Sequence, residues 1–179
     1  MNKMNSIRIR LARLEDADDI ARVHIDTWRT SYIGIIPDEH LANMSYAVGT
    51  ERWRDILNNA GKSFTFVAET DANEIVAFAG GMPERENDPV YKGELGGIYI
   101  LKAYQRQGLG RRLVEIVIGR LRQDGFNNML IWVFAENPAT SFYAMLGGKL
   151  VRERMVNIGG KDLREIGYGW DDLSVFKTK

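Results

Sequence analysis

A turn with two glycines, Gln105 to Arg112, lies between a strand-like run and an amphipathic helix. The apolar run from Glu94 to Leu101 precedes the turn, and apolar residues at helical spacing follow it from Leu109 to Leu121. Gly108 and Gly110 let the backbone turn sharply because they have no Cβ that could clash. This strand–turn–helix order predicts an α/β fold, with a cradle of main-chain N–H groups for an anion at the start of the helix.

Charge elsewhere in the chain bears on what that anion can be. Arg106, Arg111 and Arg112 would add positive charge around the turn itself. Over the whole chain 24 basic and 24 acidic residues cancel, so the formal net charge is zero. Proteins that bind nucleic acid or an anionic membrane usually have a basic excess, so neither partner is expected here. An anion site must therefore be local.

Length and composition set further bounds. The 179 residues suit one domain, which we expect to span residues 1–179. The chain has no cysteine, which excludes disulfides, a cysteine-based zinc site and a thiolate nucleophile. Its two histidines, His24 and His40, are too far apart in sequence to indicate a metal site. Residues 1–13 lack the apolar stretch of a secretion signal, and no run approaches about 18 apolar residues, so we expect a cytoplasmic protein without a membrane span.

The hydrophobic pattern predicts the order strand, two helices, three strands, helix, strand, helix, two strands, which is α/β with a mixed sheet. Adjacent glycines at Gly96 and Gly97 suggest a bulge or a close backbone approach inside a strand. Asn137-Pro138 is expected to open a short helix as N-cap and first helical residue. The expected strands cover 7–11, 63–69, 74–81, 94–101, 128–135, 149–158 and 161–170. The expected helices cover 15–32, 38–59 with a break near 45–49, 109 to a stop at Gly125, and 137–146.

Two common phosphate-binding motifs do not fit the glycine turn. A P-loop needs a lysine and then a serine or threonine after its second glycine, and both are missing here. A Rossmann dinucleotide site needs a third glycine where Leu113 stands, and it usually follows the first strand of its domain. Nucleoside triphosphate and dinucleotide chemistry are therefore disfavoured.

The turn resembles the acetyl-coenzyme A signature of the Gcn5-related N-acetyltransferase (GNAT) superfamily, Gln/Arg-x-x-Gly-x-Gly/Ala, at Gln105, Gly108 and Gly110. The second signature of that superfamily is matched by Asn137, Ala139, Phe142, Tyr143, Leu146 and Gly147, although Asn137 stands six residues before Tyr143 where many members have seven. The element order is also similar along nearly the whole chain. The resemblance implies a mixed, mainly antiparallel sheet of about six to seven strands flanked by helices, and acetyl-CoA as cosubstrate.

The resemblance also implies where acetyl-CoA would bind. Main-chain N–H groups from Gln107 to Arg112 would bind its pyrophosphate, and the strand backbone from Ile98 to Leu101 would pair with its pantetheine arm. The expected contacts are Ile98, Tyr99, Ile100, Leu101, Gln105, Arg106, Gln107, Gly108, Leu109, Gly110, Arg111, Arg112, Asn137 and Phe142.

Transfer of the acetyl group to an amine needs an acid for the departing thiolate and a base for the amine. Tyr143 aligns with the tyrosine that many members use as the acid; alternatively it only packs in the core. Glu94 stands where relatives place an acidic residue facing the acceptor, and is our candidate base; alternatively it is a solvated carboxylate at a strand end. Without a cysteine, direct attack in a ternary complex is preferred over an acyl-enzyme.

The acceptor should be recognised by the first helices and by the loop from Pro83 to Lys92. Candidate contacts there are Trp28, Tyr32, His24 and Glu39. The two aromatics and the histidine share a helical face, and residues of these types on such a face more often belong to the core. We expect an acetyl-CoA-dependent N-acetyltransferase that acts on a primary amine of a small molecule, peptide or protein. The alternative is a non-catalytic acyl-CoA sensor on the same fold, and the choice between a monomer and a homodimer stays open.

Overall fold

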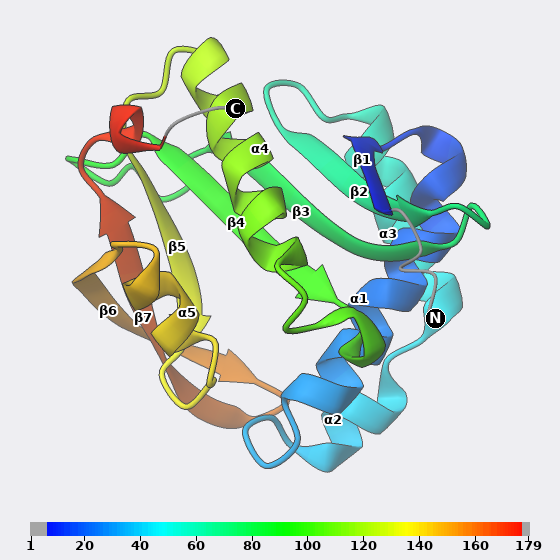
Figure 1. The fold of residues 1–179 in the computed structure, drawn as a ribbon. Helices are drawn as coiled ribbons and strands as arrows, with labels where there is room; N and C mark the ends of the chain where they lie inside the picture. The colour runs from blue at the N-terminus through cyan, green and yellow to red at the C-terminus, as the bar shows by residue number, and fades with distance from the viewer. Residues whose placement is uncertain (1–6, 177–179) are drawn as a thin grey trace.

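Seven strands form one sheet in the order β1-β2-β3-β4-β5-β7-β6 in the computed structural model, which describes residues 7–176 (Figure 1). Every neighbouring pair is antiparallel except β4 and β5. The predicted mixed, mainly antiparallel sheet is therefore confirmed. The strands are β1 (Ile7–Leu11), β2 (Phe64–Thr70), β3 (Ile75–Pro83), β4 (Gly93–Ile100), β5 (Met129–Phe134), β6 (Lys149–Ile158) and β7 (Lys161–Trp170).

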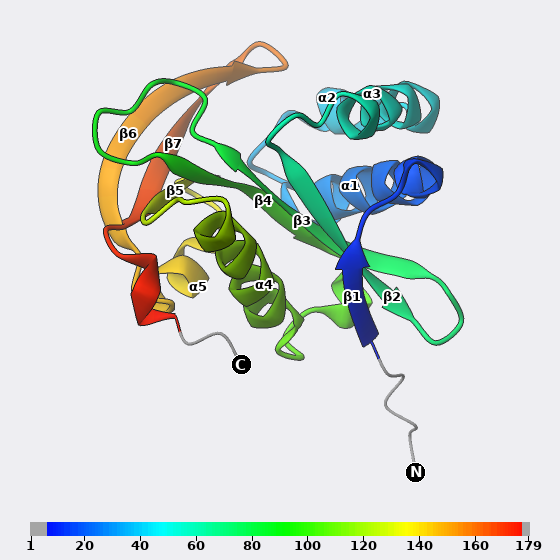
Figure 2. The same ribbon diagram turned by 90° about the horizontal axis from the view of Figure 1, so that it is seen from above.

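Helices cover both faces of this sheet (Figure 2). On one face lie α1 (Ala17–Ser31), α2 (Asp38–Asn43) and α3 (Tyr46–Asn58), and on the other lie α4 (Leu109–Gln123) and α5 (Thr140–Met145). Apolar stripes explain the arrangement: Ile20 and Val23 of α1 pack on Phe78, whereas Leu113 and Val117 of α4 pack on the opposite face. Short 3₁₀ turns cover Leu14–Asp16, Lys102–Tyr104 and Leu173–Val175.

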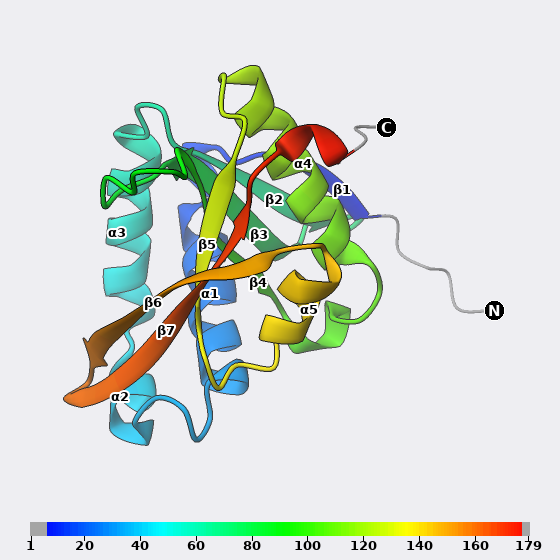
Figure 3. The same cartoon turned by 90° about the vertical axis from the view of Figure 1, so that its left-hand side faces the viewer.

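The two halves of the sheet separate between β4 and β5. These strands pair only at Gly93 with Met129 and at Glu94 with Leu130, and beyond those pairs they diverge (Figures 1 and 3). Among the described residues, no strand pairs with the β5-facing edge of β4 from Leu95 to Ile100. Apart from the Ile100 carbonyl, which accepts a hydrogen bond from the Gln105 side chain, that edge therefore offers unpaired main-chain groups to a ligand.

The expected irregularity in β4 is a β-bulge. Gly80 pairs with Gly97 and Gly81 pairs with Leu95, so Gly96 is an extra residue on β4. A Cβ at Gly96 would lie 2.5 Å from the methyl carbon of Met82. The prediction of a bulge from the two adjacent glycines is thus confirmed.

The short helix α5 begins later than predicted. It starts at Thr140, and Pro138 is in a turn rather than at the first helical position. Asn137 accounts for the delay, because its side-chain Oδ1 accepts a hydrogen bond of 2.9 Å from the Ala139 N–H and its carbonyl accepts one of 3.0 Å from Thr140. The N-cap interpretation of Asn137 was therefore wrong, although the residue does close the turn before the helix.

The break expected near residues 45–49 of the helical region 38–59 is found at Met44 and Ser45, at the N-terminal end of the expected segment. Ser45 caps α3 by accepting a hydrogen bond from the Val48 N–H. The expected lack of a secretion signal rests on residues 1–13. Residues 1–6 of that segment lie outside the described residues. In the part that the structure describes, no helix combines the length and apolar character needed to cross a membrane.

An ion-pair network attaches β1 to the rest of the sheet and gives a testable pH dependence. Arg10 contacts Glu69 through Nη2 and Oε1 at 3.0 Å and contacts Asp16 through Nη1 and Oδ2 at 2.6 Å. Hydrogen bonds from Arg10 and Arg8 lower the pKa of Glu69 from 4.5 to about 2. Because the folded-state pKa lies below the unfolded one, this stabilisation is present above the unfolded pKa and is lost as the pH falls toward 2.

We therefore expect Glu69→Gln to flatten the acid side of the stability profile. The free energy of unfolding, measured by urea titration between about pH 7 and pH 2, should fall less steeply in the variant than in the wild type. Glu51→Gln is a matched control, because Glu51 pairs with Arg54 on the exposed surface of α3. Equal acid destabilisation of Glu69→Gln and the wild type would contradict this account.

Candidate functional site

The glycine turn connects β4 to α4 and leaves N–H groups free at the start of the helix. Gly108 is the N-cap with φ +81°, and Arg106 is also left-handed with φ +60°. The first hydrogen bond of the helix runs from the Arg112 N–H to the Gly108 carbonyl, so the N–H groups of the preceding turn have no acceptor within the helix. Gln105 attaches the turn to the end of β4 by donating from Nε2 to the Ile100 carbonyl at 2.8 Å. This geometry is that of an anion cradle.

A cavity of about 710 Å³, the splay pocket, opens where β4 and β5 diverge and extends to the glycine turn. Most of the residues predicted to bind the cofactor line it, together with Tyr143 and Tyr32. Those that line it are Ile98, Tyr99, Ile100, Gln105, Arg106, Gly108, Gly110, Arg111, Asn137 and Phe142. The structure therefore brings the two sequence signatures to one cavity.

Four predicted cofactor residues do not line this pocket. Leu109 is buried in the core, and Leu101 donates its N–H to the Val76 carbonyl of β3. The Gln107 side chain donates to the Ala103 carbonyl at 2.8 Å. Arg112 donates from Nη2 to the Ile7 carbonyl at 2.7 Å and so ties α4 to β1, while its N–H is already bonded within the helix. The N–H groups of Leu101 and Arg112 are thus already bonded, whereas the predicted main-chain contacts of Gln107 and Leu109 stay predictions.

Tyr143 of α5 is only 5% exposed and lines the splay pocket. Its ring lies edge-on to Phe142 at 5.3 Å, and Tyr168 lies 6.2 Å away. Burial raises the pKa of Tyr143 well above its ordinary value of 10. The phenol therefore keeps its proton at neutral pH. Tyr143 packs in the core and also lines the pocket, so core packing does not exclude the acid role, which stays a prediction.

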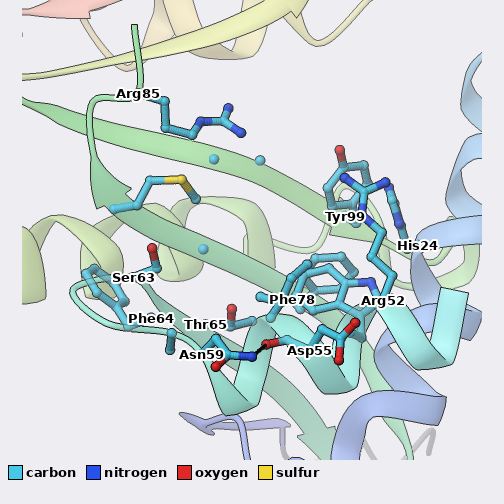
Figure 4. Close-up of a pocket in the computed structure, with 17 residues that line it drawn as sticks. His24, Arg52, Asp55, Asn59, Ser63, Phe64, Thr65, Phe78, Arg85 and Tyr99 are labelled. Carbon is cyan, nitrogen blue, oxygen red and sulfur yellow. Dashed lines mark hydrogen bonds between the residues drawn. The ribbon is translucent and has the colours of Figure 1, made fainter. Parts of the chain in front are cut away.

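A second cavity of about 590 Å³, the α3 pocket, lies between α3 and the strands β2 to β4 (Figure 4). Tyr99 lines both cavities, so the two pockets adjoin at β4. The α3 pocket is lined by His24, Arg52, Trp53, Asp55, Ile56, Asn59, Ala60, Ser63, Phe64, Thr65, Phe78, Gly80, Met82, Arg85, Gly96, Gly97 and Tyr99.

Glu94 points to the α3-pocket side of the sheet. Glu94 is paired with Met82 in the β3–β4 register, and directly opposed residues point to the same face of the sheet. Met82 lines the α3 pocket, as do Tyr99 and its partner Phe78. The Glu94 side chain is 2% exposed, and Arg85 binds it through two bonds, Nη2 to Oε1 at 2.5 Å and Nε to Oε2 at 3.1 Å. The bond to Glu94 raises the pKa of Arg85. Glu94 is therefore not a solvated strand-end carboxylate, and whether it acts as a base stays a prediction.

The predicted acceptor residues separate into different places. His24 lines the α3 pocket, where burial lowers its pKa to about 4, so the imidazole is neutral at neutral pH. Tyr32 lines the splay pocket instead, near Asn137. Trp28 packs edge-on against His24 at 5.5 Å and Tyr32 at 5.1 Å, and lines neither pocket. Glu39 is exposed on α2 and lines neither pocket, so the structure does not support it or Trp28 as an acceptor contact.

Sequence reasoning missed Arg52 and the aromatic wall formed by Trp53 and Phe78. Arg85 lies in the loop from Pro83 to Lys92 that was expected to meet the acceptor, but it was not singled out. An arginine on an exposed helix has no distinguishing pattern in one sequence, and Trp53 had the spacing of a core residue. Only the packing of α3 on the sheet brings these residues to one cavity.

A model of the acetyltransferase (GNAT) family matches residues 24–147, a region that contains both signatures and most of both pockets. The chain belongs to this family. The uncharacterized N-acetyltransferase YuaI of Bacillus subtilis is 39% identical over 172 residues, which cover 96% of this chain and 97% of YuaI. The probable N-acetyltransferase Rv2775 of Mycobacterium tuberculosis is 28% identical over 148 residues, 79% of each chain. This member of the family is an N-acetyltransferase.

Solved GNAT structures share the fold. The PaiA N-acetyltransferase of Thermoplasma acidophilum, solved in complex with coenzyme A, superposes with a TM-score of 0.68 at 19% identity, over 89% of this chain and 98% of that one. YncA of Salmonella typhimurium, a putative acetyltransferase solved with acetyl-CoA, has a TM-score of 0.70 at 20% identity, over 94% and 95% of the chains. At these identities the likeness establishes the fold.

Proposed function

We propose that this N-acetyltransferase transfers the acetyl group of acetyl-CoA to a primary amine by direct attack in a ternary complex. The observation that carries this proposal is the junction of two pockets at Tyr99. The splay pocket ends at an anion cradle, and the α3 pocket lies above a buried carboxylate. Two substrates could thus meet at β4 with Tyr143 on one side and Glu94 on the other, and the chain has no cysteine to hold an acyl group.

The residues of the splay pocket fit coenzyme A. The free N–H groups at the start of α4, next to the left-handed Gly108, suit a pyrophosphate, and Arg106 and Arg111 line the same cavity. The unpaired edge of β4 suits the amides of an extended pantetheine arm, since it can add hydrogen bonds as a neighbouring strand would. The solved structures of PaiA with coenzyme A and of YncA with acetyl-CoA support this assignment. When bound, acetyl-CoA supplies an acetyl group activated as a thioester.

Tyr143 is proposed as the general acid. Tyr143 lines the splay pocket, and no side-chain hydrogen bond with a described residue contributes to the pKa of its hydroxyl, so the proton is available to a ligand. The raised pKa keeps the phenol protonated over the neutral range. Tyr143 would give this proton to the departing thiolate sulfur as the carbon–sulfur bond breaks.

Glu94 is proposed as the general base. A lysine-like amine has a pKa of about 10.4 and is mostly charged at neutral pH, so it must lose a proton before it can attack. A carboxylate has about four lone-pair sites, and the bidentate Arg85 uses two, which leaves sites for a water that carries the proton from the amine. Arg85 would hold the carboxylate in place toward the α3 pocket.

Acetyl-CoA binding can be tested by thermal melting. Ligand at about 100 times its dissociation constant should stabilise the fold by about 2.7 kcal/mol, or about 5 to 10 °C for a chain of this size. Gly108→Val should remove this shift, because a β-branched residue is strained at φ +81° and would distort the cradle.

Gly34→Val is the matched control for this experiment. Gly34 has φ +77°, and no described atom lies within 4 Å of the position that its Cβ would take, as at Gly108, but it lines neither pocket. Both variants should lose similar stability, whereas only Gly34→Val should keep the shift with acetyl-CoA. A full shift in Gly108→Val would contradict the cradle.

A further inference from the structure

Arg52 of α3 extends along the wall of the α3 pocket toward His24 and Tyr99 (Figure 4). Among the described residues no carboxylate forms an ion pair with it. Arg54, two residues on in the same helix, behaves differently, because it pairs with Glu51 at 2.6 Å and with Asp18 at 3.3 Å outside the pocket. The Arg52 guanidinium therefore has its donors free at the place where the two pockets adjoin.

The positive charge of Arg52 affects the titratable groups where the two pockets adjoin. It contributes to the lowered pKa of His24, and both Arg52 and Arg85 favour the ionised form of the Tyr99 hydroxyl, although burial outweighs them and raises the pKa of Tyr99. Two carboxylates also belong to the surroundings of the pocket. The carboxylate of Glu94 forms an ion pair with Arg85. Asp55 lies one helical turn after Arg52 in α3, away from Tyr99 in Figure 4.

One wall of the pocket is apolar and aromatic, and its polar lining residues besides Arg52 include Asn59, Ser63 and Thr65. Trp53 packs edge-on against Phe78 at 5.0 Å, and Phe78 stacks on Tyr99 at 5.0 Å. His24 is neutral and adds its ring to the same wall, 4.7 Å from Tyr99. The cavity thus combines an apolar surface with an unpaired guanidinium at one end, in a volume typical of a small-molecule site.

We propose that the acceptor is a primary amine that carries a carboxylate beside an apolar or aromatic side chain, an amino acid rather than a polyamine, and that Arg52 binds its carboxylate. The inference rests on the proposed function, because it places the acceptor in the α3 pocket. The planar guanidinium presents two parallel donors that match a carboxylate, and a hydrophobic side chain would pack on the aromatic wall. A polyamine would instead bring positive charge toward the unpaired guanidinium of Arg52.

The test compares thiol release from acetyl-CoA with L-amino acids, with their carboxamides, which keep the amine and the side chain, and with spermidine. A hydrogen bond to a charged group should make kcat/KM about 10- to 100-fold higher for the amino acid than for its carboxamide. Arg52→Gln should bring this ratio close to one, Arg52→Lys should give an intermediate ratio, and the control Arg54→Gln should keep the wild-type ratio. A preference for carboxamides or spermidine, or an unchanged ratio in Arg52→Gln, would overturn the inference.

A binding arm separates failure of this inference from failure of the proposed function. 3-Phenylpropionate has the carboxylate and the ring but no amine, so its binding needs no transfer. It should bind more tightly than 3-phenylpropionamide by calorimetric titration, and Arg52→Gln should remove the difference. Equal binding of the two compounds would overturn the role of Arg52 whatever the enzyme acetylates, whereas a lack of thiol release with every amine would count against the proposed function alone.

Discussion

Tyr143→Phe is expected to lower kcat for acetyl transfer by about 100- to 1,000-fold, the usual contribution of a positioned general acid. The substitution removes only the hydroxyl, and the ring keeps its contact with Phe142 in the core. Acetyl-CoA binding should therefore persist, because the anion cradle and the β4 edge are untouched. Thiol release at saturating substrates gives kcat, and the melting shift with acetyl-CoA reports binding in the same samples.

Tyr168→Phe is the control for this prediction. Its ring lies 6.2 Å from that of Tyr143, but it lines neither pocket, so its loss should leave kcat close to that of the wild type. A rate in Tyr143→Phe within a few-fold of the wild type would show that the tyrosine only packs in the core.

Glu94→Gln should lower kcat/KM at neutral pH by about 100-fold, because the amine would have no base to take its proton. The amide keeps one oxygen that can accept from Arg85, so the fold should survive the change. The deficit should shrink as the pH rises toward the pKa of the amine, since a growing fraction of the amine is then neutral without help. A pH profile of kcat/KM measures this directly.

Arg85→Gln distinguishes a catalytic role of Glu94 from a structural one. If Glu94 is the base, Arg85→Gln should keep substantially more activity than Glu94→Gln, because the carboxylate that takes the proton is still present. If the ion pair is only structural, both variants should lose activity alike, with no change in the shape of the profile. A constant deficit of Glu94→Gln at every pH would also contradict the base assignment.

Much of the fold follows from local patterns in the chain. The alternation in β1 and the stripe on α4 each specify an element, and the glycine pair specifies the bulge of β4. The glycine turn was predictable in detail because only a residue without a Cβ adopts φ +81° readily at the N-cap of α4. The start of α5 was not, since the side chain of Asn137 competes with the helix for the same backbone groups.

The parts of the site that main-chain groups form were predictable from the sequence. The parts that side chains form were less so. Trp28 and Tyr32 stand on one helical face, yet one packs in the core and the other lines the splay pocket, because the second residue lies where the sheet opens. Arg52 and Glu94 are ordinary charged residues in the sequence. The packing of α3 over β4 gives each its place in or beside one cavity.

The most direct test of the proposed mechanism mixes the enzyme and acetyl-CoA with a panel of amino acids and other primary amines. One mass-spectrometric experiment then measures the acetylated amine, free coenzyme A and acetylated protein. Direct transfer predicts equal amounts of acetylated amine and coenzyme A, with the protein unmodified and little coenzyme A released without an amine. Acetylated protein that forms before the product, or binding of acetyl-CoA without acetylation of any amine, would contradict it.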